Sequence, residues 1–425
     1  LKEVMVYDDI TAINGAADVA YVDKINRNTS AGNPWKKTKK AFIHAIPPIN
    51  GLQEPVMANP EIMSRVNKCI ETYISGRRYM PNFCAHLKDE PIKFKKIEMG
   101  KTRVFTGAPF DWTIVVRKYL LSVIKLIQEN RFTFESAPGT VAQSTEWGDI
   151  YYYLTKFGKD RIVAGDYSAF DKRMPSSVIL AAFDIIVEIC RKAGYTDEEL
   201  RVVRGIAEDT AFPLVDFHGD LIEFYGSNPS GHPLTVIING LANCLYMRYC
   251  YSVLSPNKNC DDFKSNVTLM TYGDDNIMGV SRHCDFFDHT KIVKVLEEIN
   301  IKYTMADKES ESVPFIHIDN ANFLKRTWRY DVDVKGILCP LEHESIEKML
   351  TVCVASKTIS SETQAVAVIA TALREYFFYG KQVYEEKMEM FKEVIEENDL
   401  QFYVEDYVFP SWQSLCDDFW EASKQ

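Results

Sequence analysis

The chain has 425 residues, 46% of them hydrophobic, which suffices for one large domain or two to three subdomains and excludes a disordered or fibrous chain. Lysine and arginine total 49 against 60 for aspartate and glutamate, and this net charge of −11, taken over the whole chain, argues against a nucleic-acid ligand. The charge is uneven, however, because residues 24–103 carry +10 and residues 381–425 carry −8.

The ten cysteines are scattered along the chain without a Cys-x-x-Cys pair, which is typical of reduced thiols in a cytosolic protein. Cys260, His283, Cys284 and His289 are near one another in sequence, but their irregular spacing does not favour a zinc site over ordinary buried thiols.

Neither a membrane span nor a signal peptide is expected. The most apolar segments, residues 178–190 and 234–247, are interrupted by polar residues and are shorter than the roughly 20 residues that a spanning helix needs. No basic or apolar leader follows Leu1. Because the chain lacks an initiator Met, we expect it to be cut from a longer polypeptide.

The first predicted elements are loops and strands in two basic segments. Residues 24–40 contain six basic residues and no acidic one, and residues 77–103 contain eight basic and three acidic residues. A solvated surface is the ordinary explanation of such runs. Here glycine, proline and aromatic residues are interleaved with the basic ones, which favours segments that lie along a phosphate backbone.

The middle of the chain predicts a strand followed by a helix. Residues 161–165 are a short apolar segment that ends at Asp166, which is typical of a buried strand. Residues 176–193 have helical periodicity, and Ser176 is the expected N-cap.

A hairpin and a helical region complete the predicted elements. Residues 266–271 and 276–280 are apolar segments joined by Tyr-Gly-Asp-Asp, which predicts a hairpin with carboxylates at its tip. Residues 346–378 and 384–398 are expected to be mostly helical.

Three carboxylates stand at the ends of the predicted strands: Asp166, Asp274 and Asp275. Clustered carboxylates repel one another, and Mg²⁺ or Mn²⁺, which prefer oxygen ligands, would relieve the repulsion. Two such ions about 3.5 to 4 Å apart are the usual apparatus of nucleotidyl transfer. Taken alone, Asp166 is better explained as an ordinary strand end, and Asp274 with Asp275 as an ordinary turn. The residues near these carboxylates weaken that explanation.

Those neighbours are polar residues that suit a ribose. Asp171 follows Asp166 by five residues. Ser230 precedes an apolar helical segment in which the i, i+4 spacing of Thr235 and Asn239 puts both on one face. Asp171 and Asn239 could together bind a ribose hydroxyl.

Three segments then occur in a characteristic order: Gly-Asp-Tyr-Ser-Ala-Phe-Asp at 165–171, Pro-Ser-Gly at 229–231 with Thr235 and Asn239, and Tyr-Gly-Asp-Asp at 272–275. In this order and spacing they resemble motifs A, B and C of the RNA-dependent RNA polymerases of picorna-like positive-strand RNA viruses. A lone Tyr-Gly-Asp-Asp is moderately specific, whereas the ordered set is strongly so.

Shorter segments agree with this resemblance. They are similar to motifs G, F, D and E and lie at residues 29–34, 88–103, 306–308 and 322–326. Gly-Lys-Thr at 100–102 could instead suggest a Walker phosphate loop, but the required glycine five residues earlier is Lys95, which excludes that interpretation.

The resemblance implies a role for each motif residue. Asp166, Asp274 and Asp275 would bind metal ions, and Lys308, near phosphate and shielded enough to tune its proton affinity, would be the general acid that protonates pyrophosphate. The residues implied in nucleotide binding are Lys88, Lys101, Arg103, Asp171, Ser230, Thr235 and Asn239. Those implied in RNA binding are Thr29, Ser30, Gly32, Gly231, Lys325 and Arg326.

The implied fold is α+β, a right-hand polymerase whose antiparallel palm sheet is backed by helices. Fingers would take residues 1–124 with an insertion at 203–226, the palm residues 125–202 and 227–330, and a helical thumb residues 331–425. Asp166 and Asp274 would meet at the open edge of the palm sheet.

The implied activity is template-directed RNA synthesis from nucleoside triphosphates by two-metal-ion nucleotidyl transfer, which replicates a viral genome. Mg²⁺ is the expected cofactor, with Mn²⁺ able to substitute. The expected partners are RNA template and primer and NTPs, with a protein primer and other viral replication proteins as further candidates. The expected location is the host cytoplasm, at membrane-associated replication complexes but without a membrane span.

Two features depart from the family pattern. The segment before residue 29 is shorter than family members usually have, which suggests that part of the arm bridging fingers and thumb is absent and that the chain is a fragment. The second is Asn276, which follows the paired aspartates and whose effect does not follow from the sequence.

Two other classes of protein compete with this interpretation. A reverse transcriptase also has paired aspartates on a hairpin, but it would need a bulky residue that excludes the 2′-hydroxyl rather than Asp171 with Asn239. A non-catalytic RNA-binding or scaffold protein on a decayed polymerase fold is disfavoured because all of the expected metal ligands are present.

Overall fold

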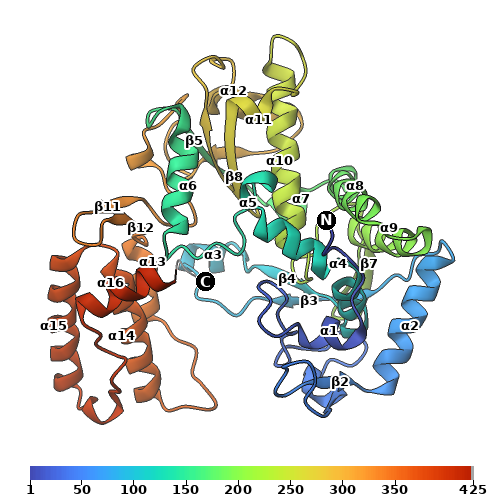
Figure 1. Ribbon diagram of the computed structural model, residues 1–425, viewed down its shortest axis with the longest axis horizontal. Coiled ribbons are helices and arrows are strands. Elements are labelled where there is room, and N and C mark those ends of the chain that lie inside the picture. The colour runs from blue at the N-terminus through green and yellow to red at the C-terminus, as the bar shows by residue number, and fades with distance from the viewer. Residues whose placement is uncertain (423–425) are drawn as a thin grey trace.

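The computed structural model describes residues 1–422, and its elements form three groups. Figure 1 shows the C-terminal helices on one side of the molecule and the N-terminal elements on the other. A sheet from the middle of the chain lies between and above them.

A mixed four-stranded sheet in the order β4-β3-β6-β7 organises the N-terminal group. Strands β3 (Asn82–Leu87) and β4 (Val104–Gly107) are antiparallel, and β6 (Leu214–Phe217) runs parallel to β3 before it pairs with β7 (Asp220–Glu223). Residues 214–223 therefore return to the N-terminal group from the middle of the chain.

Helices α2 (Pro60–Ile74), α4 (Phe110–Glu129) and α9 (Asp197–Ala211) pack against one another beside this sheet. The N-terminal group also contains α1 (Asp9–Asn14), the 3₁₀ helix η1 (Lys39–Phe42), β1 (Ile43–Ala45), β2 (Val56–Ala58) and α3 (Phe94–Glu98).

The central sheet has four antiparallel strands in the order β10-β5-β9-β8. Its strands are β5 (Ile162–Tyr167), β8 (Val267–Tyr272), β9 (Asp275–Val280) and β10 (Tyr303–Met305). Helices α10 (Thr235–Leu254) and α12 (His289–Glu298) pack on one face, and α6 (Glu146–Leu154) packs on the other. The remaining short elements are α5 (Arg131–Phe134), η2 (Thr155–Phe157), α7 (Phe170–Arg173), α11 (Phe263–Asn266) and η3 (Ile318–Asn320).

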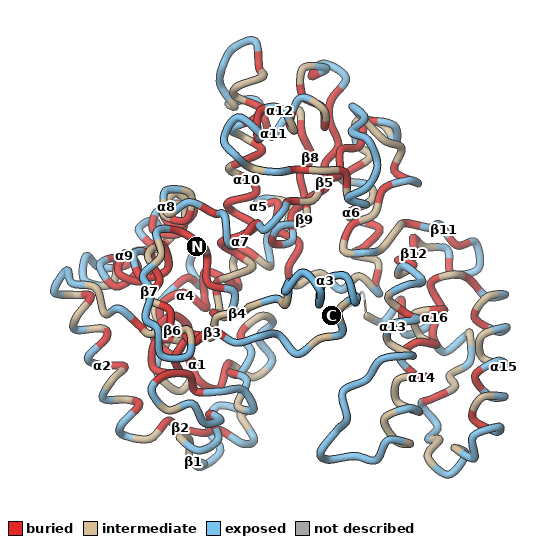
Figure 2. Tube along the Cα trace, turned by 180° about the vertical axis from the view of Figure 1, so that it is seen from behind, coloured by how far each residue is buried: buried red, intermediate tan, exposed pale blue. Residues whose placement is uncertain are grey.

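This sheet separates two hydrophobic cores because successive side chains in a strand point to opposite faces. Val163 and Leu269 belong to the core formed with α8 (Ser176–Ala193), α10 and the N-terminal helices. Ala164 and Met270 belong to the core shared with α6 and the C-terminal helices. Both faces are thus buried, as the buried trace of these strands in Figure 2 also shows, which explains their nearly continuous apolar sequence.

The C-terminal group consists of helices and one short hairpin. Its elements are β11 (Arg329–Asp331), β12 (Gly336–Leu338), α13 (His343–Thr351), α14 (Ser361–Phe377), α15 (Lys381–Glu397), η4 (Gln401–Tyr403) and α16 (Trp412–Glu421). Helix α14 packs against α13, α15 and α16. Figure 1 shows that this group stands apart from α2 and α9.

The structure confirms the predicted hairpin and corrects three details of the predicted elements. Strand β5 continues through Asp166 and Tyr167 because β10 pairs with both residues. The N-cap of α8 is Pro175, and Ser176 is already helical. The C-terminal helical region is interrupted at residues 352–360, which are exposed and non-helical.

Two further observations concern the cysteines and the helices. All ten cysteines, which fall within the described part of the chain, are free thiols. Over residues 1–422, no helix combines the length and apolarity that crossing a membrane requires.

Candidate active site

Strand pairing brings the three predicted carboxylates to one end of the central sheet. Gly165 of β5 pairs with Asn276 of β9, which sets Asp166 beside Asp275. Tyr272 pairs with Asp275 across a two-residue turn. The turn needs the left-handed backbone of Gly273, with φ of +62°, and it carries Asp274 at the tip of the hairpin.

Asp166 and Asp275 are half-buried, whereas Asp274 is exposed at the tip of the hairpin, and the three carboxylates repel one another. Partial desolvation by the surrounding protein, and next the charge of Asp166, raise the pKa of Asp274, whereas the nearby charges of Lys308 and Arg103 lower it. The Lys308 ammonium lies 2.9 Å from Asp166 Oδ2, so a cation is accommodated beside this carboxylate. Hard oxygen donors whose mutual repulsion is only partly relieved suit a divalent metal ion.

Asp275 is oriented differently from its two neighbours. Its Oδ2 accepts a hydrogen bond of 2.9 Å from the backbone N–H of Leu324. Burial raises the pKa of Asp275 to about 7 although this hydrogen bond opposes the shift. Across residues 1–422, no three His, Cys, Asp or Glu side chains form a ready-made metal cluster.

A buried polar network holds the hairpin from behind. Asn243 of α10 donates its amide to the carbonyl oxygens of Gly273, at 3.1 Å, and Asp275, at 3.3 Å. Its Oδ1 accepts from Tyr167, at 3.0 Å, and from the amide of Asn276, at 2.8 Å. Tyr303 completes the network by donating to Asn276 Oδ1 at 2.7 Å. The structure thus explains Asn276, which is fully buried and links the hairpin to the helix behind it.

The two residues expected to bind ribose are in direct contact. Asn239 Nδ2 donates to Asp171 Oδ1 at 2.6 Å, and burial is the largest cause of the raised pKa of Asp171. Thr235 begins α10, but its hydroxyl donates to the Pro229 carbonyl at 2.7 Å and so stabilises the preceding loop.

The 229–231 loop is bound to strand β4. Ser230 Oγ accepts from the backbone N–H of Thr106 at 3.0 Å, and Thr106 Oγ1 accepts from the N–H of Ser230 at 3.1 Å. A Cβ on Gly231 would lie 2.2 Å from the Thr106 carbonyl oxygen. Gly231 is therefore required for this close approach of two backbones.

The basic residues around residue 100 lie on an exposed loop near the carboxylates. Arg103 is paired with Glu90 at 3.2 Å, and Lys88 is paired with the same carboxylate at 3.4 Å. The charge of Arg103 opposes the rise in the pKa values of both Asp171 and Asp274, so Arg103 lies near the site. Lys101 is exposed on the same loop.

The predicted 29–34 loop is ordered by its own side chains. Lys39 is buried and donates to Thr29 Oγ1 at 2.5 Å and to the Ser30 carbonyl at 2.9 Å. Burial lowers the pKa of Lys39 to about 8. Gly32 has φ of +70° and would place a Cβ 3.0 Å from Pro109.

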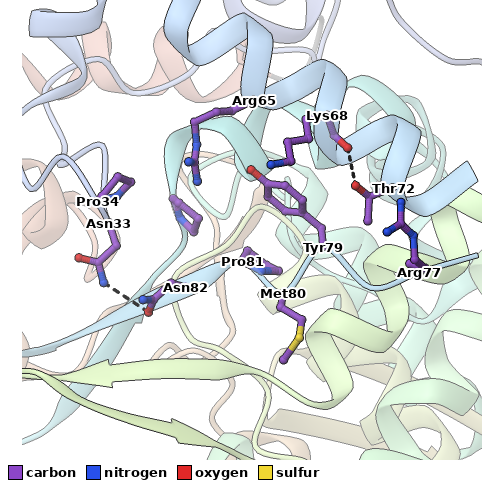
Figure 3. A pocket seen from close by; sticks show the side chains of 11 residues that line it. Asn33, Pro34, Arg65, Lys68, Thr72, Arg77, Tyr79, Met80, Pro81 and Asn82 are labelled. Atoms are coloured by element: carbon purple, nitrogen blue, oxygen red, sulfur yellow. Dashed lines mark hydrogen bonds between the residues drawn. The ribbon is translucent and has the colours of Figure 1, made fainter. Parts of the chain in front are cut away.

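A basic pocket adjoins this loop (Figure 3). Its volume is about 490 Å³, and Asn33 and Pro34 of the loop line one side of it. Arg65, Lys68 and Arg77 line another side. Arg65 and Lys68 do not stand out in the sequence because the acidic residues between the two basic segments cancel their charge, although their i, i+3 spacing puts them on one face of α2.

The two basic residues of the 322–326 turn have different surroundings. Lys325 is exposed and is paired with Glu342 at 2.6 Å. Arg326 is largely buried and makes a bidentate pair with Glu375 of α14, at 2.7 and 2.9 Å. This placement does not favour the phosphate contact expected for Arg326, because the guanidinium is already used to join the turn to the C-terminal helices.

Lys308 also differs from the expectation in one respect. Its side chain is 67% exposed, so the expected shielding from water is not observed. Its position beside Asp166 nevertheless follows from a turn in which Asp307 accepts backbone hydrogen bonds from Glu309 and Ser310.

Paired aspartates on an antiparallel sheet, set between a basic N-terminal group and a helical C-terminal group, are the arrangement of the right-hand polymerase fold. A solved structure described as Sicinivirus 3Dpol RNA-dependent RNA polymerase has the same fold, with a TM-score of 0.78 and 21% identity over 99% of this chain and 82% of that one.

Residues 4–395 match the family described as viral RNA-dependent RNA polymerase, and the chain belongs to that family. It is 28% identical over 399 residues to the replicase polyprotein of Drosophila C virus, and 29% identical over 404 residues to the genome polyprotein of deformed wing virus. Each alignment covers 90% of this chain but only 22% and 14% of those polyproteins. The chain thus spans at most about a fifth of these relatives, and the resemblance inferred from the motifs is confirmed.

Proposed function

We propose that this chain extends an RNA primer on an RNA template and thereby replicates a viral genome. The 3′-oxygen of the primer would attack the α-phosphorus of a nucleoside triphosphate and form the new P–O bond. The bond to the β-phosphate would break, with pyrophosphate as the leaving group. The observation that carries this proposal is the meeting of Asp166 with Asp274 beside Arg103 and Lys308 at one end of the central sheet.

The carboxylates would hold the metal ions. Asp166 and Asp274 are the proposed ligands, with Asp275 assisting and also fastening the hairpin to Leu324. Two bound Mg²⁺ ions, or Mn²⁺ ions instead, would activate the 3′-hydroxyl and neutralise the charge of the triphosphate. Lys88, Lys101 and Arg103 would contact the triphosphate, and Ser230 and Thr235 would shape the floor of the nucleotide site through the 229–231 loop.

Lys308 is the proposed general acid, and replacing it by methionine is expected to slow incorporation by about 10²-fold, because pyrophosphate would leave without a positioned proton donor. Lys308→Arg keeps the charge beside Asp166 and is expected to slow the reaction too, since arginine does not release its proton. Single-turnover incorporation at several pH values measures this. A Lys308→Met enzyme with the rate and pH profile of the parent would contradict the assignment.

Asn239 and Asp171 are proposed to bind the ribose. Replacing Asn239 by alanine is expected to weaken the preference for UTP over dUTP by about tenfold or more, because one good hydrogen bond to the sugar is worth about that factor. The kcat/KM values for both nucleotides on one template give the ratio. An unchanged ratio would remove the ribose-binding role.

We further propose a route for RNA and a division of the chain. Fingers would comprise residues 1–124 and 203–226, the palm residues 125–202 and 227–330, and the thumb residues 331–425. This division is supported by the pairing of β6 with β3 and of β7 with β6, and by the separate helical group. RNA would contact Thr29, Ser30, Gly32, Gly231 and Lys325. Crosslinking to RNA with peptide mapping tests these contacts, and marks confined to other segments would contradict them.

The partners beyond RNA and NTPs are proposals as well. A protein primer and other viral replication proteins would act with the chain at membrane-associated complexes in the host cytoplasm. Fractionation of infected cells tests the location, and a polymerase recovered away from membranes and from the other replication proteins would contradict it.

Primer extension tests the function as a whole. With poly(rA), an oligo(U) primer and UTP, we expect elongation in Mg²⁺ or Mn²⁺ and none after chelation. Elongation with dTTP in preference to UTP would indicate a reverse transcriptase. RNA binding without elongation in either metal would favour the non-catalytic alternative.

A further inference from the structure

A line of hydrogen-bonded side chains leads from the interior of the protein to the proposed ribose site. His232 Nε2 lies 3.3 Å from Asn228 Oδ1. Asn228 Nδ2 donates to Asn239 Oδ1 at 2.8 Å, and Asn239 Nδ2 donates to Asp171 Oδ1 at 2.6 Å. His232 and Asn228 do not belong to the residues that the sequence motifs single out.

One backbone contact sets the direction of every hydrogen bond in this line. The N–H of Leu234 donates to His232 Nδ1 at 3.2 Å, so Nδ1 is the acceptor and the ring proton resides on Nε2. Nε2–H must then donate to Asn228 Oδ1, which leaves the Asn228 amide nitrogen facing Asn239. Asn239 in turn must present its own nitrogen to Asp171.

The line is fixed in place and is electrically neutral up to Asp171. His232, Asn228 and Asn239 are 9%, 2% and 6% exposed. Burial lowers the pKa of His232 to about 3, so the ring carries no charge at neutral pH. Its edge packs against Trp112, with the ring centroids 5.7 Å apart.

Asn228 is the rigid link of the line. Its backbone N–H donates to the Asp171 carbonyl at 2.9 Å, and its Nδ2 also approaches the Thr235 carbonyl at 3.4 Å. The side chain is therefore held against both elements that supply the ribose site. A rotated Asn239 amide would set two nitrogens face to face at Asn228 and its oxygen against the Asp171 carboxylate, which costs two hydrogen bonds.

We propose that His232 and Asn228 are positioning residues that fix the orientation of the Asn239 amide and thereby determine the preference for ribonucleotides over deoxyribonucleotides. With Oδ1 of Asp171 occupied by Asn239, the second carboxylate oxygen is the acceptor that we assign to a ribose hydroxyl. This inference rests on the proposed polymerase function and deepens it.

The test is the ratio of kcat/KM for UTP to that for dUTP in variants of the line. Asn228→Leu keeps the approximate size of the side chain but removes its hydrogen bonds to His232 and Asn239. It is expected to lower the ratio by about tenfold, close to the effect of Asn239→Ala. His232→Phe keeps the ring beside Trp112 and is expected to lower the ratio by about threefold, since the Asn228 amide can then rotate. This second variant serves if Asn228→Leu does not fold.

A matched control separates positioning from general destabilisation. Asn14 is also a buried amide and is bound to Val56 and Ile10 in the N-terminal group. Asn14→Leu is expected to leave the ratio unchanged, because a loss of folded enzyme lowers the rates with UTP and dUTP by the same factor. In an Asn239→Ala background, Asn228→Leu is expected to cause no further change.

The outcomes distinguish this inference from the function on which it rests. If Asn239→Ala lowers the ratio but Asn228→Leu and His232→Phe leave it within about twofold of the parent, the inference is wrong and the function stands. Independent, multiplying effects of Asn228→Leu and Asn239→Ala would also overturn it. Failure of the parent enzyme to extend an RNA primer would overturn the function itself.

Discussion

Replacing Asp274 by alanine is expected to reduce nucleotide incorporation by at least about 10³-fold, which corresponds to about 4 kcal/mol of transition-state stabilisation, while RNA binding stays nearly unchanged. Asp274 stands at the tip of the hairpin, where it and Asp166 are the proposed oxygen ligands of the metal ions. The contacts proposed for RNA lie on other segments. Rapid-quench incorporation and equilibrium binding of a primer-template measure the two effects.

The same change should not harm folding, which separates it from a structural defect. Partial desolvation and the charge of Asp166 both raise the pKa of Asp274, so ionised Asp274 is held at a cost in the folded protein. We expect Asp274→Ala to have an equal or higher melting temperature. Asp220→Ala, an exposed change on β7, is the control and should keep full activity. An Asp274→Ala enzyme that incorporates nucleotides at the parental rate would refute the two-metal assignment.

Replacing Asn243 by leucine is expected to lower the free energy of unfolding by about 3 kcal/mol and to slow incorporation by about 10²-fold. Leucine has a similar size but leaves the buried polar groups of Gly273, Asp275, Tyr167 and Asn276 without this partner. The hairpin that carries the carboxylates then loses these hydrogen bonds to α10. Urea unfolding and single-turnover incorporation with saturating substrates measure the two effects.

Asn14→Leu is the matched control, since Asn14 also makes four hydrogen bonds from a buried position, to Ile10, Val56 and Arg27. It is expected to destabilise the protein similarly but to leave the rate of the folded enzyme unchanged. Equal rate losses in the two variants would show that Asn243 acts only through global stability.

The parts of the site that the sequence predicts are those that depend on local pattern. Two apolar segments and turn chemistry locate the hairpin with Asp274 and Asp275, and another apolar segment locates the strand with Asp166. Asp171 is singled out by Asp166, five residues before it, and Asn239 by Thr235, one helical turn before it. The structure brings these two residues, 68 residues apart in the chain, into contact at 2.6 Å.

The parts that the sequence does not predict depend on tertiary contacts. The orientation of Asp275 is set by Leu324, and the burial of Arg326 is set by Glu375, each 49 residues away in the chain. Asn243 is a polar residue in an apolar helix one turn after Asn239, and this was the available signal for its buried role. No local pattern marks His232, because the donors and acceptors that define its ring orientation become known only when the 228–235 loop is folded.

The network behind the hairpin has a consequence for how the enzyme responds to its solution. Asn243, Asn276, Tyr167 and Tyr303 are neutral near pH 7, since burial raises the pKa of both tyrosines still further. Hydrogen bonds between neutral buried groups are insensitive to ionic strength, whereas contacts between basic side chains and phosphates weaken steeply as salt is added. Added salt should therefore release RNA from the enzyme long before it disturbs the carboxylates, so that loss of affinity and loss of catalytic geometry occur under separate conditions.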